Sequence, residues 1–438
     1  MNKMNGSNQE AFLNTEINRQ LKEHNVPVMF PAHLAGLSEE DFEIEFRKDR
    51  KDFRNLSVMT IDSADCKDMD DAISLEVTSS GYILGVHIAD VTAYVLPHSD
   101  LDQEALNRGT SIYLPSLTIP MLPEVLTNNL CSLVPGKDRN TISVLINLDM
   151  NANVTSYSVT KGVIRSRIKG VYSEINSIFE CKASDYVKRR YAVVKEMLTK
   201  MKILSELLRE KRMAEGANIQ TNSVPKITIE NSGILVWPKI NKSAEIMVEE
   251  FMVLTNRLVS EFMIANCLPC IFRTQRIKNT KACYMSVANI HAELALDTYC
   301  HFTSPIRRYP DLLVHRALGY YLSGLSSAEI AALMDTETMN EVSEITTKRS
   351  RRAADIEYCI RRYCYAMYFS WHKREQFHGQ VTGENNPNGQ TLIKLDRYNL
   401  LVIGNAALKE YQGHRVSFYI DIDNRSYLKA HDIQLEVA

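Results

Sequence analysis

The densest chemical signal in this sequence is a run of aspartates in the segment TIDSADCKDMDDA. The acidic residues are Asp62, Asp65, Asp68, Asp70 and Asp71, and Lys67 is the only basic residue among them. Two carboxylates about 5 Å apart repel each other by roughly 3 kcal/mol at an effective dielectric constant near 20. A packed fold keeps such a group only when a cation or shared protons neutralise it. Because oxygen-only ligands suit magnesium, the segment predicts a Mg²⁺ site, and two neighbouring ions could be held by one loop.

Other interpretations of the acidic segment fit less well or stay open. A calcium EF-hand needs ligands at positions one, three and five, Gly at six and Glu at twelve, and the loop counted from Asp62 lacks them. A phosphomonoester hydrolase or phosphotransferase with a DxDx loop needs its nucleophilic aspartate at the end of an apolar strand. Asp68 instead follows the polar run SADCK. A solvated acidic loop without a metal remains open.

A second group of chemical residues lies in HFTSPIRRYPDLLVHRAL, residues 301–318. The pattern predicts a helix that begins at Pro305, with the preceding Thr-Ser pair as its cap and with Arg307 and Arg308 in its first turn. Cations at this end of a helix oppose its dipole, so an anion such as phosphate is expected between the arginines and the free backbone amides. The alternative is that both arginines form ion pairs with Asp311 or with the acidic loop.

Aromatic rings beside basic residues form a third group. Tyr113, Tyr172 and Phe302 could each stack on an unpaired base, although a single ring of this kind more often packs in the core. Glu357 is a single acid in the basic helix RRAADIEYCIRR and is interpreted as a local ion-pair partner.

The composition sets the class of protein. The chain has 438 residues, of which 45% are hydrophobic and 24% charged, which is typical of a soluble globular protein with two or three domains. No stretch resembles a membrane span, and the start MNKMNGSNQE does not resemble a signal peptide, so we expect a cytoplasmic protein with no membrane partner. The nine cysteines are interpreted as reduced thiols, and the CxxC pair Cys267 and Cys270 lacks a second ligand pair for zinc.

Charge is distributed unevenly along the chain. The net charge of −2 does not by itself indicate a nucleic-acid binder. Basic residues nevertheless concentrate in one region, between about Arg307 and Arg362, and the helix from Lys348 onward is strongly basic.

The hydrophobic pattern predicts three units. Residues 1–54 form a helical leader, in which residues 11 to about 50 contain a helix, a Pro-containing turn and a second, strongly charged helix. Residues 55–373 form an α/β (α+β) unit in which the aspartates lie between two strands, followed by long helices at 185–213, 305–322 and 338–372. Residues 374–438 contain five short strands that fit a small all-β OB-type barrel.

Five blocks of this sequence, taken together and in order, resemble the catalytic (RNB-type) domain of the ribonuclease II and ribonuclease R family. They are TIDSADCKDMDDAISL, HIADVTAYV, SIYLPSLTIPMLPEVLTNNLCSL, IMVEEFMVLTNRLV and HFTSPIRRYPDLLVHRAL, and the similarity spans about residues 20–372. The resemblance implies an α/β catalytic domain and a C-terminal OB-type, S1-like barrel. It also implies processive 3′ to 5′ hydrolysis of single-stranded RNA to nucleoside 5′-monophosphates, with two magnesium ions that Mn²⁺ could replace.

The resemblance also assigns site residues. Asp62, Asp68, Asp70 and Asp71 match the metal-site aspartates, with Asp70 most directly tied to catalysis. Arg307 would steady the scissile phosphate, and Arg308 continues the same basic patch. Tyr113 would hold the 3′-terminal nucleotide, and Tyr172 would stack near the outer end of the bound strand. Either Glu249 or Glu250, together with Glu357, would contact the terminal nucleotides.

The sequence departs from the family pattern at its beginning. Family members usually carry two cold-shock-type barrels ahead of the catalytic domain, and fewer than about 60 residues precede the first aspartate here. Weaker and more salt-sensitive RNA binding is therefore expected. A non-catalytic RNA-binding member of the family is the alternative function, although none of the four matching aspartates is replaced.

Overall fold

The computed structural model describes residues 6–43, 49–219, 224–230, 233–238, 241–386, 388–423 and 427–436. Within these ranges its centre is a seven-stranded sheet in the order β1-β8-β7-β4-β3-β2-β9. The strands are β1 (Lys51–Asp52), β2 (Met59–Asp62), β3 (Asp71–Thr78), β4 (Gly81–Ala89), β7 (Asp138–Asp149), β8 (Val154–Arg165) and β9 (Ile168–Val171). Neighbours are antiparallel except for the β1–β8 and β2–β9 pairs.

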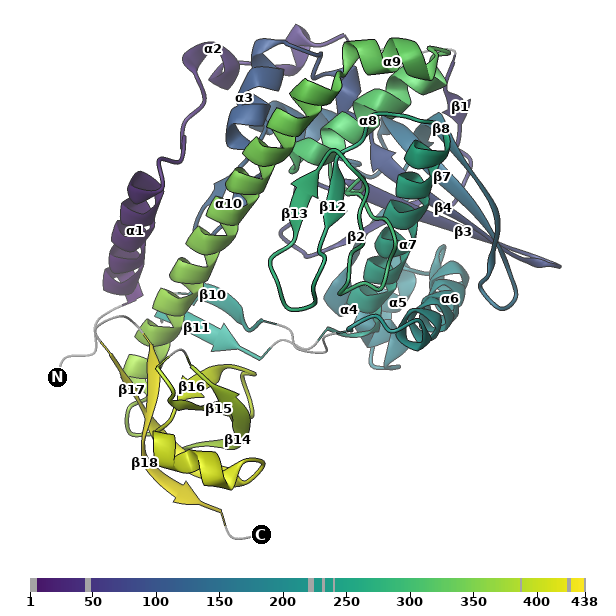
Figure 1. Cartoon of the computed structure of the whole chain (residues 1–438). Helices are drawn as coiled ribbons and strands as arrows, with labels where there is room; N and C mark the ends of the chain where they lie inside the picture. The colour runs from purple at the N-terminus through teal and green to yellow at the C-terminus, as the bar shows by residue number, and fades with distance from the viewer. Residues whose placement is uncertain are drawn as a thin grey trace.

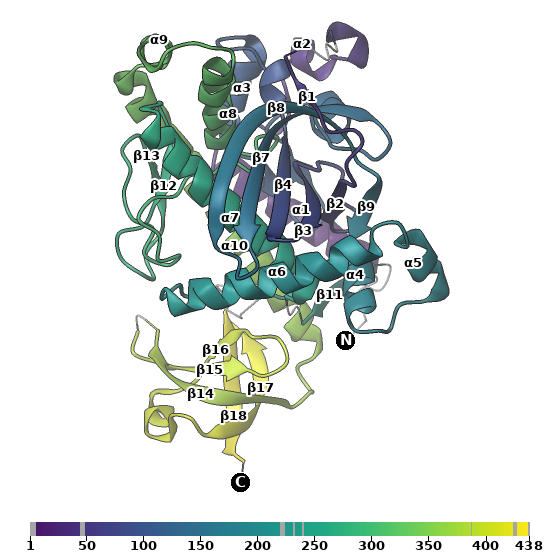
Figure 2. The same cartoon turned by 90° about the vertical axis from the view of Figure 1, so that its right-hand side faces the viewer.

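Helices cover this sheet and place its apolar residues in one large core. α7 (Ser243–Ala265) contacts β4, and α6 (Lys195–Ala214) packs beside α7 and against β3, with α4 (Tyr172–Phe179) and α5 (Asp185–Arg190) next to them (Figure 2). β4 is buried along almost its whole length. A strand covered on both faces is expected to be continuously apolar, as GYILGVHIA nearly is.

The second half of the chain is dominated by one long helix. α8 (Tyr309–Leu322) and α9 (Ser327–Leu333) precede α10 (Thr336–Trp371), which runs from these helices to the C-terminal barrel (Figure 1). Short hairpins lie around it: β5 (Ile112–Tyr113) with β6 (Thr118–Ile119), β10 (Lys226–Glu230) with β11 (Gly233–Trp237), and β12 (Phe272–Thr274) with β13 (Cys283–Met285). α3 (Asp100–Arg108) lies near its start.

The C-terminal strands close into a barrel, as the strand pattern predicted. β14 (Phe377–Asn385), β15 (Thr391–Leu395), β16 (Leu401–Ile403), β18 (Leu428–Leu435) and β17 (Arg415–Ile422) follow one another around it. Its interior residues, such as Val381 and Phe418, share a core with Phe369 of α10. The α/β fold class with an all-β OB-type barrel is therefore confirmed.

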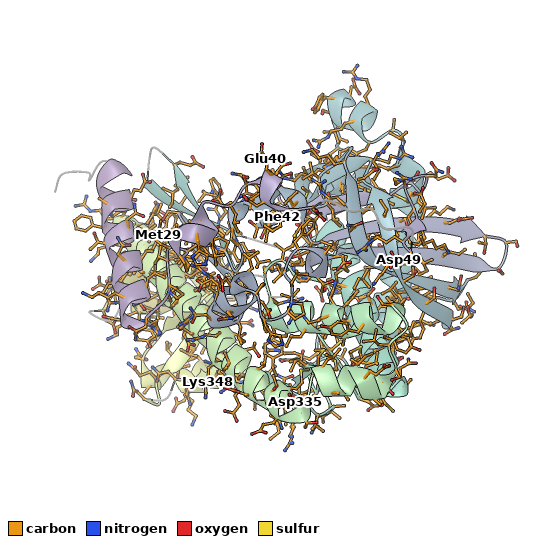
Figure 3. The ribbon with its side chains drawn as sticks, turned by 90° about the horizontal axis from the view of Figure 1, so that it is seen from above. Met29, Glu40, Phe42, Asp49, Asp335 and Lys348 are labelled. Atoms are coloured by element: carbon orange, nitrogen blue, oxygen red, sulfur yellow. The ribbon has the colours of Figure 1, made fainter. Side chains whose placement is uncertain are left out.

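The leader is less helical than predicted. α1 (Gly6–Glu23) packs on α10 and β11. After α2 (Ala32–Ala35), the described residues hold only a 3₁₀ turn at Glu39–Asp41, and residues 44–48 of the expected charged helix lie outside the described residues. Seen from above, this segment crosses the molecule from Met29, past Glu40 and Phe42, to Asp49 beside the sheet (Figure 3).

The prediction of one continuous helix over 185–213 was wrong in one respect, because the structure has two helices there, α5 and α6. The break falls at Tyr191, which is fully buried. Its hydroxyl accepts from the backbone amide of Val171 at 2.8 Å and donates to Glu174 at 2.7 Å. These tertiary contacts hold the residue in a position that a continuous exposed helix would not give.

Two whole-chain expectations can be compared with the structure. All nine cysteines lie in described residues and none forms a disulfide. Within the described residues, none of the helices combines the length and the apolar character that a membrane crossing requires.

Candidate active site at the aspartate loop

The aspartate loop connects two neighbouring strands of the sheet. Asp62 is the last residue of β2, and Asp71 is the first residue of β3. Because β2 and β3 pair with each other through Met59 and Ile73, their ends hold the two carboxylates near the same edge. The backbone carbonyl of Asp70 also accepts a hydrogen bond from the amide of Ala89 in the next strand, at 2.9 Å.

Two side chains from elsewhere in the chain fix the backbone of this loop. The Ser132 hydroxyl donates to the carbonyl of Lys67 at 2.6 Å and accepts from the amide of Met69 at 3.1 Å, so it bridges the residues on either side of Asp68. Lys169 of β9 donates to the carbonyls of Ala64 and Cys66 at 2.9 and 2.5 Å. Sequence reasoning missed both residues, since a lone serine and a lone lysine carry no recognisable pattern.

Asp70 is the most enclosed of the four aspartates. Its side chain is 3% exposed, and its Oδ1 accepts a hydrogen bond from the amide of Ile306 at 2.8 Å. Its Oδ2 lies 3.4 Å from the Nε of Arg307. The structure thus brings together Asp70 and Arg307, which are far apart in sequence.

Few hydrogen-bond donors reach the carboxylates of the other aspartates. The Cys66 thiol lies 3.6 Å from Asp62 Oδ1 and 3.5 Å from Asp68 Oδ1, and the Tyr113 hydroxyl donates to Asp68 Oδ2. The Oδ2 atoms of Asp62, Asp70 and Asp71 are buried and have no hydrogen-bond partner among the described residues. Buried charged oxygens without donors are costly unless something neutralises them.

The pKa values of these carboxyl groups reflect that burial. Loss of hydration is the main cause that raises the pKa of Asp62 to about 6 and that of Asp71 to about 7. The charge of Asp68 adds to the rise for Asp62 and the charge of Asp62 adds to the rise for Asp71, while Arg307 lowers the pKa of both. Burial also raises the pKa of Asp70 well above its ordinary value, although Arg307 acts in the opposite direction. Such shifts are typical of functional carboxylates and of carboxylates that hold a cation.

The donor chemistry of the loop fits a hard divalent cation. Three buried carboxylate oxygens lack donors, and oxygen ligands are those that Mg²⁺ prefers. As arranged, however, the described residues contain no group of three or more His, Cys, Asp or Glu side chains close enough to hold a metal ion. The aspartates therefore provide suitable ligands, and a bound ion would have to draw their carboxylates closer together.

The predicted start of the arginine helix was wrong. α8 begins at Tyr309, so Arg307 and Arg308 precede it, and Arg308 is the N-cap residue in an extended conformation with φ −138°. The backbone here pairs with another segment instead, because the amide of Ser111 donates to the carbonyl of Arg307 at 3.0 Å. Asp311 Oδ1 accepts from the amide of Ser304 at 2.8 Å.

The two arginines have different environments as a result. Arg308 donates to Asp311 at 2.7 Å, which is the ion pair considered as an alternative. Arg307 points to Asp70, donates to the Ser304 hydroxyl at 3.0 Å, and keeps 44% of its side chain exposed. Arg307 is therefore the arginine that can contact an anion at the aspartates.

Tyr113 and Glu357 complete one side of the site. The backbone amide of Tyr113 donates to Glu357 Oε1 of α10 at 3.2 Å, and Glu357 also lies 3.5 Å from Arg361. Asp68, Tyr113 and Glu124 line a cavity of about 330 Å³ beside the loop. Glu357 thus has the ion pair expected from sequence and a position next to the predicted stacking tyrosine.

The remaining predicted residues lie in different surroundings. Tyr172 follows directly after Val171, the β9 residue paired with Asp62, and is partly buried near the aspartates. Phe302 is fully buried and stacks on His315, so it packs in the core. Arg308 is paired as described above.

Within the described residues, Glu249 and Glu250 form no hydrogen bond or ion pair with the aspartate loop and instead form ion pairs with α6. Arg212 lies 2.7 Å from Glu250 and 3.0 Å from Glu249, and Arg209 lies 3.1 Å from Glu250. Their contact with terminal nucleotides stays a prediction, and the structure gives Glu250, which is 2% exposed, a role in joining two helices.

Comparisons with known proteins agree with this fold. The model of the RNB domain family matches residues 50–290 and 277–324, and the chain belongs to this family. Ribonuclease R of Thermotoga maritima is 34% identical over 392 residues, which cover 76% of this chain and 55% of that protein. The chain spans about half the length of the curated relatives it matches.

Two solved structures show how widely the fold is used. Mycoplasma genitalium RNase R in complex with ribose-methylated single-stranded RNA superposes with a TM-score of 0.81 at 21% identity, covering 95% of this chain and 78% of that chain. Yeast Ssd1, described as a pseudonuclease, superposes with a TM-score of 0.63 at 17% identity, covering 93% of this chain and 57% of that chain. The fold alone therefore does not establish catalysis, and the argument has to rest on the site.

Proposed function

We propose that this protein is a magnesium-dependent exoribonuclease that hydrolyses single-stranded RNA processively from its 3′ end and releases nucleoside 5′-monophosphates. One observation carries the proposal. Three aspartate oxygens are buried without a hydrogen-bond donor, and the half-exposed guanidinium of Arg307 lies beside them, 3.4 Å from Asp70. A cation site beside an anion-binding arginine suits a reaction at a phosphodiester. Family membership and the relatives named ribonuclease R support the same class of activity.

Each group has a defined task in this proposal. Asp62, Asp68, Asp70 and Asp71 would hold magnesium, which supplies activation of water and stabilisation of the leaving oxygen when bound. Arg307 contacts a phosphate oxygen and stabilises the charge that develops on it. The amide of Ile306 and the side chain of Arg307 keep Asp70 oriented.

The RNA strand would be positioned by aromatic rings. Tyr113 lies 38% exposed at the cavity beside the loop, where a terminal base can stack on its ring. Tyr172 lies on the other side of the loop, near the end of β9. A contact to a 2′-hydroxyl would allow the site to reject DNA.

The test is a degradation assay. A 5′-labelled, unstructured RNA of about 30 nucleotides and its DNA counterpart are incubated with magnesium or with EDTA, using the wild-type protein and Asp70→Asn. We expect shortening of the RNA, but not of the DNA, to a short 5′-labelled core without a ladder of intermediates, only with magnesium and not with Asp70→Asn. RNA that is bound but stays intact under all conditions would refute catalysis and favour an RNA-binding protein.

A second variant tests the assignment of Arg307. Arg307→Lys keeps the charge but removes the planar pair of donors, so we expect turnover to fall by about 10²-fold with little change in RNA affinity. Arg189→Lys is the matched control, since Arg189 is exposed on α5 and its guanidinium forms no hydrogen bond or ion pair with the described residues. Equal losses of turnover and affinity in Arg307→Lys would contradict a role in the transition state.

A further inference from the structure

A cavity of about 340 Å³ lies where α10 meets the C-terminal barrel, away from the aspartate loop. Figure 1 shows the C-terminal barrel beside the lower end of α10. The walls of the cavity include Tyr358, Arg361, Arg362 and Tyr365 of α10, with Leu401 of β16 and Tyr427 beside β18. The volume is at the small end of the range for ligand pockets, about 300–1,000 Å³, so it suits one ring system and not a duplex.

Arg362 lines this cavity beside two aromatic rings. Its guanidinium lies 4.4 Å from the ring centre of Tyr427 and 5.6 Å from that of Tyr358. Its Nε is buried and has no hydrogen-bond partner among the described residues. Arg362 as a whole is only partly buried, so the terminal nitrogens of its guanidinium are the donors that could meet an acceptor on a base or a phosphate.

The aromatic walls leave open surface for a ligand. Tyr358 is 53% exposed, Tyr427 is 37% exposed, and Leu401 is 47% exposed. Large apolar faces that stay in water beside an arginine are the usual surface on which an unpaired base stacks. The mixture of rings and cations therefore fits a nucleobase better than a purely apolar ligand.

The cavity is also connected to the candidate active site along one face of α10. Arg361 lines the cavity, and it lies 3.5 Å from Glu357, one helical turn earlier. Glu357 in turn accepts from the amide of Tyr113, whose hydroxyl donates to Asp68. One turn of four residues advances about 6 Å along the helix. The same helix face therefore leads from the aspartate loop to the barrel.

We propose that this cavity binds one unpaired base of an RNA strand whose 3′ end lies at the aspartate loop. Tyr358 and Tyr427 supply the stacking surfaces, and Arg362 donates to the base edge or to the adjoining phosphate. The inference rests on the proposed function, which it extends by adding a base-binding site upstream of the site of hydrolysis. It gives the barrel and α10 a shared role in holding the strand.

The test identifies which base of the RNA strand enters the cavity and which side chain binds it. RNAs of about 12 nucleotides, each with a single abasic position walked along the strand, are titrated onto the full-length protein in EDTA, and binding is followed by fluorescence anisotropy. In the wild-type protein, one abasic position upstream of the 3′-terminal nucleotides should weaken binding by about tenfold, the order expected from one lost base stack. In Tyr358→Ala, intact RNA should bind about tenfold more weakly, and that abasic position should cause no additional loss.

Controls separate a specific contact from a general defect. Tyr186→Ala removes a tyrosine that is 63% exposed on α5, and it should leave the abasic profile unchanged. Arg362→Gln should reduce the same positional effect, and the thermal transition of each variant reports whether it is folded. Losses at other abasic positions, such as those facing Tyr113, should persist in Tyr358→Ala.

The outcomes distinguish this inference from the proposed function. RNA binding with an abasic profile that Tyr358→Ala and Arg362→Gln do not alter would overturn the base site while leaving the exoribonuclease proposal intact. Absence of RNA binding by the wild-type protein in every arm would overturn both. Positional coupling to Tyr358 would support the inference even if the degradation assay showed no turnover.

Discussion

Replacing Asp71 with asparagine should stabilise the metal-free protein at neutral to alkaline pH while impairing its function. Burial, together with the negative charge of Asp62, raises the pKa of Asp71 from its ordinary value of 3.8 to about 7. Asp71 Oδ2 is buried without a hydrogen-bond partner among the described residues, so the change to asparagine breaks no hydrogen bond at this atom. The amide keeps the shape of the carboxyl group and removes its charge.

The sign follows from proton linkage. The folded state binds the Asp71 proton more tightly than the unfolded state, so this group's contribution to stability is full below about pH 3.8 and is lost as pH rises through about 7. A shift of roughly three pKa units corresponds to an upper limit of about 4 kcal/mol. Because the side chain is partly exposed and its titration depends on the charge of Asp62, we expect a gain of about 1–3 kcal/mol for Asp71→Asn.

The measurement is urea unfolding of both proteins in EDTA at about pH 8 and about pH 5. The advantage of Asp71→Asn should be largest at the higher pH and should shrink at the lower. Asp65→Asn is the matched control from the same loop, since Asp65 is exposed and its hydrogen bond to Ser63 lowers its pKa. That variant should gain nothing. An Asp71→Asn protein that is no more stable at high pH, or whose advantage does not depend on pH, would refute the reasoning.

Three further predictions concern the support of the site. At about pH 8, magnesium at a hundredfold excess over its dissociation constant should raise the unfolding free energy by about 2.7 kcal/mol. At about pH 5.5 the gain should be much smaller, because Asp62 and Asp71 then hold protons. Thermal shifts at the two pH values measure the difference. Ser132→Ala should raise the magnesium concentration needed for half-maximal turnover by about fivefold, because one bridge across the loop costs about 1 kcal/mol, and an unchanged requirement would contradict this. Glu250→Gln should lower the unfolding free energy by about 1.5–3 kcal/mol, because Arg212 loses its buried carboxylate partner and keeps only the ion pair with Glu249, and turnover per folded molecule should be retained. Normal stability with lost RNA affinity would instead support direct nucleotide contact.

The sequence predicted those parts of the structure that local patterns encode. The alternating and apolar runs predicted strands on both sides of the aspartate loop, and five short strands predicted the barrel. The aspartate spacing predicted a concentrated group of carboxylates. In the structure β2 and β3 hold the two ends of this loop. These features depend on neighbours in the chain, so they can be inferred without knowing the tertiary fold.

The errors came from contacts between distant segments. The helix that was expected at Pro305 begins at Tyr309 because residues 306–308 pair with the segment that precedes Tyr113 and with Asp70. Ser132 and Lys169 support the aspartate loop from strands and turns far along the chain. The partner of Glu250 was equally hidden, since Arg212 belongs to another helix.

The displaced start of α8 changes the reason why Arg307 matters. Sequence reasoning placed it in the first turn of a helix, where the helix dipole would compete with its charge. In the structure it lies before the helix, and its charge faces a buried carboxylate, Asp70, that has only one backbone donor of its own. Arg307 is thus stabilised by the same group that is proposed to hold the cation. If a metal binds Asp70, this ion pair weakens, and the half-exposed guanidinium becomes more available to a phosphate. Metal binding and phosphate binding are therefore expected to be coupled through Asp70.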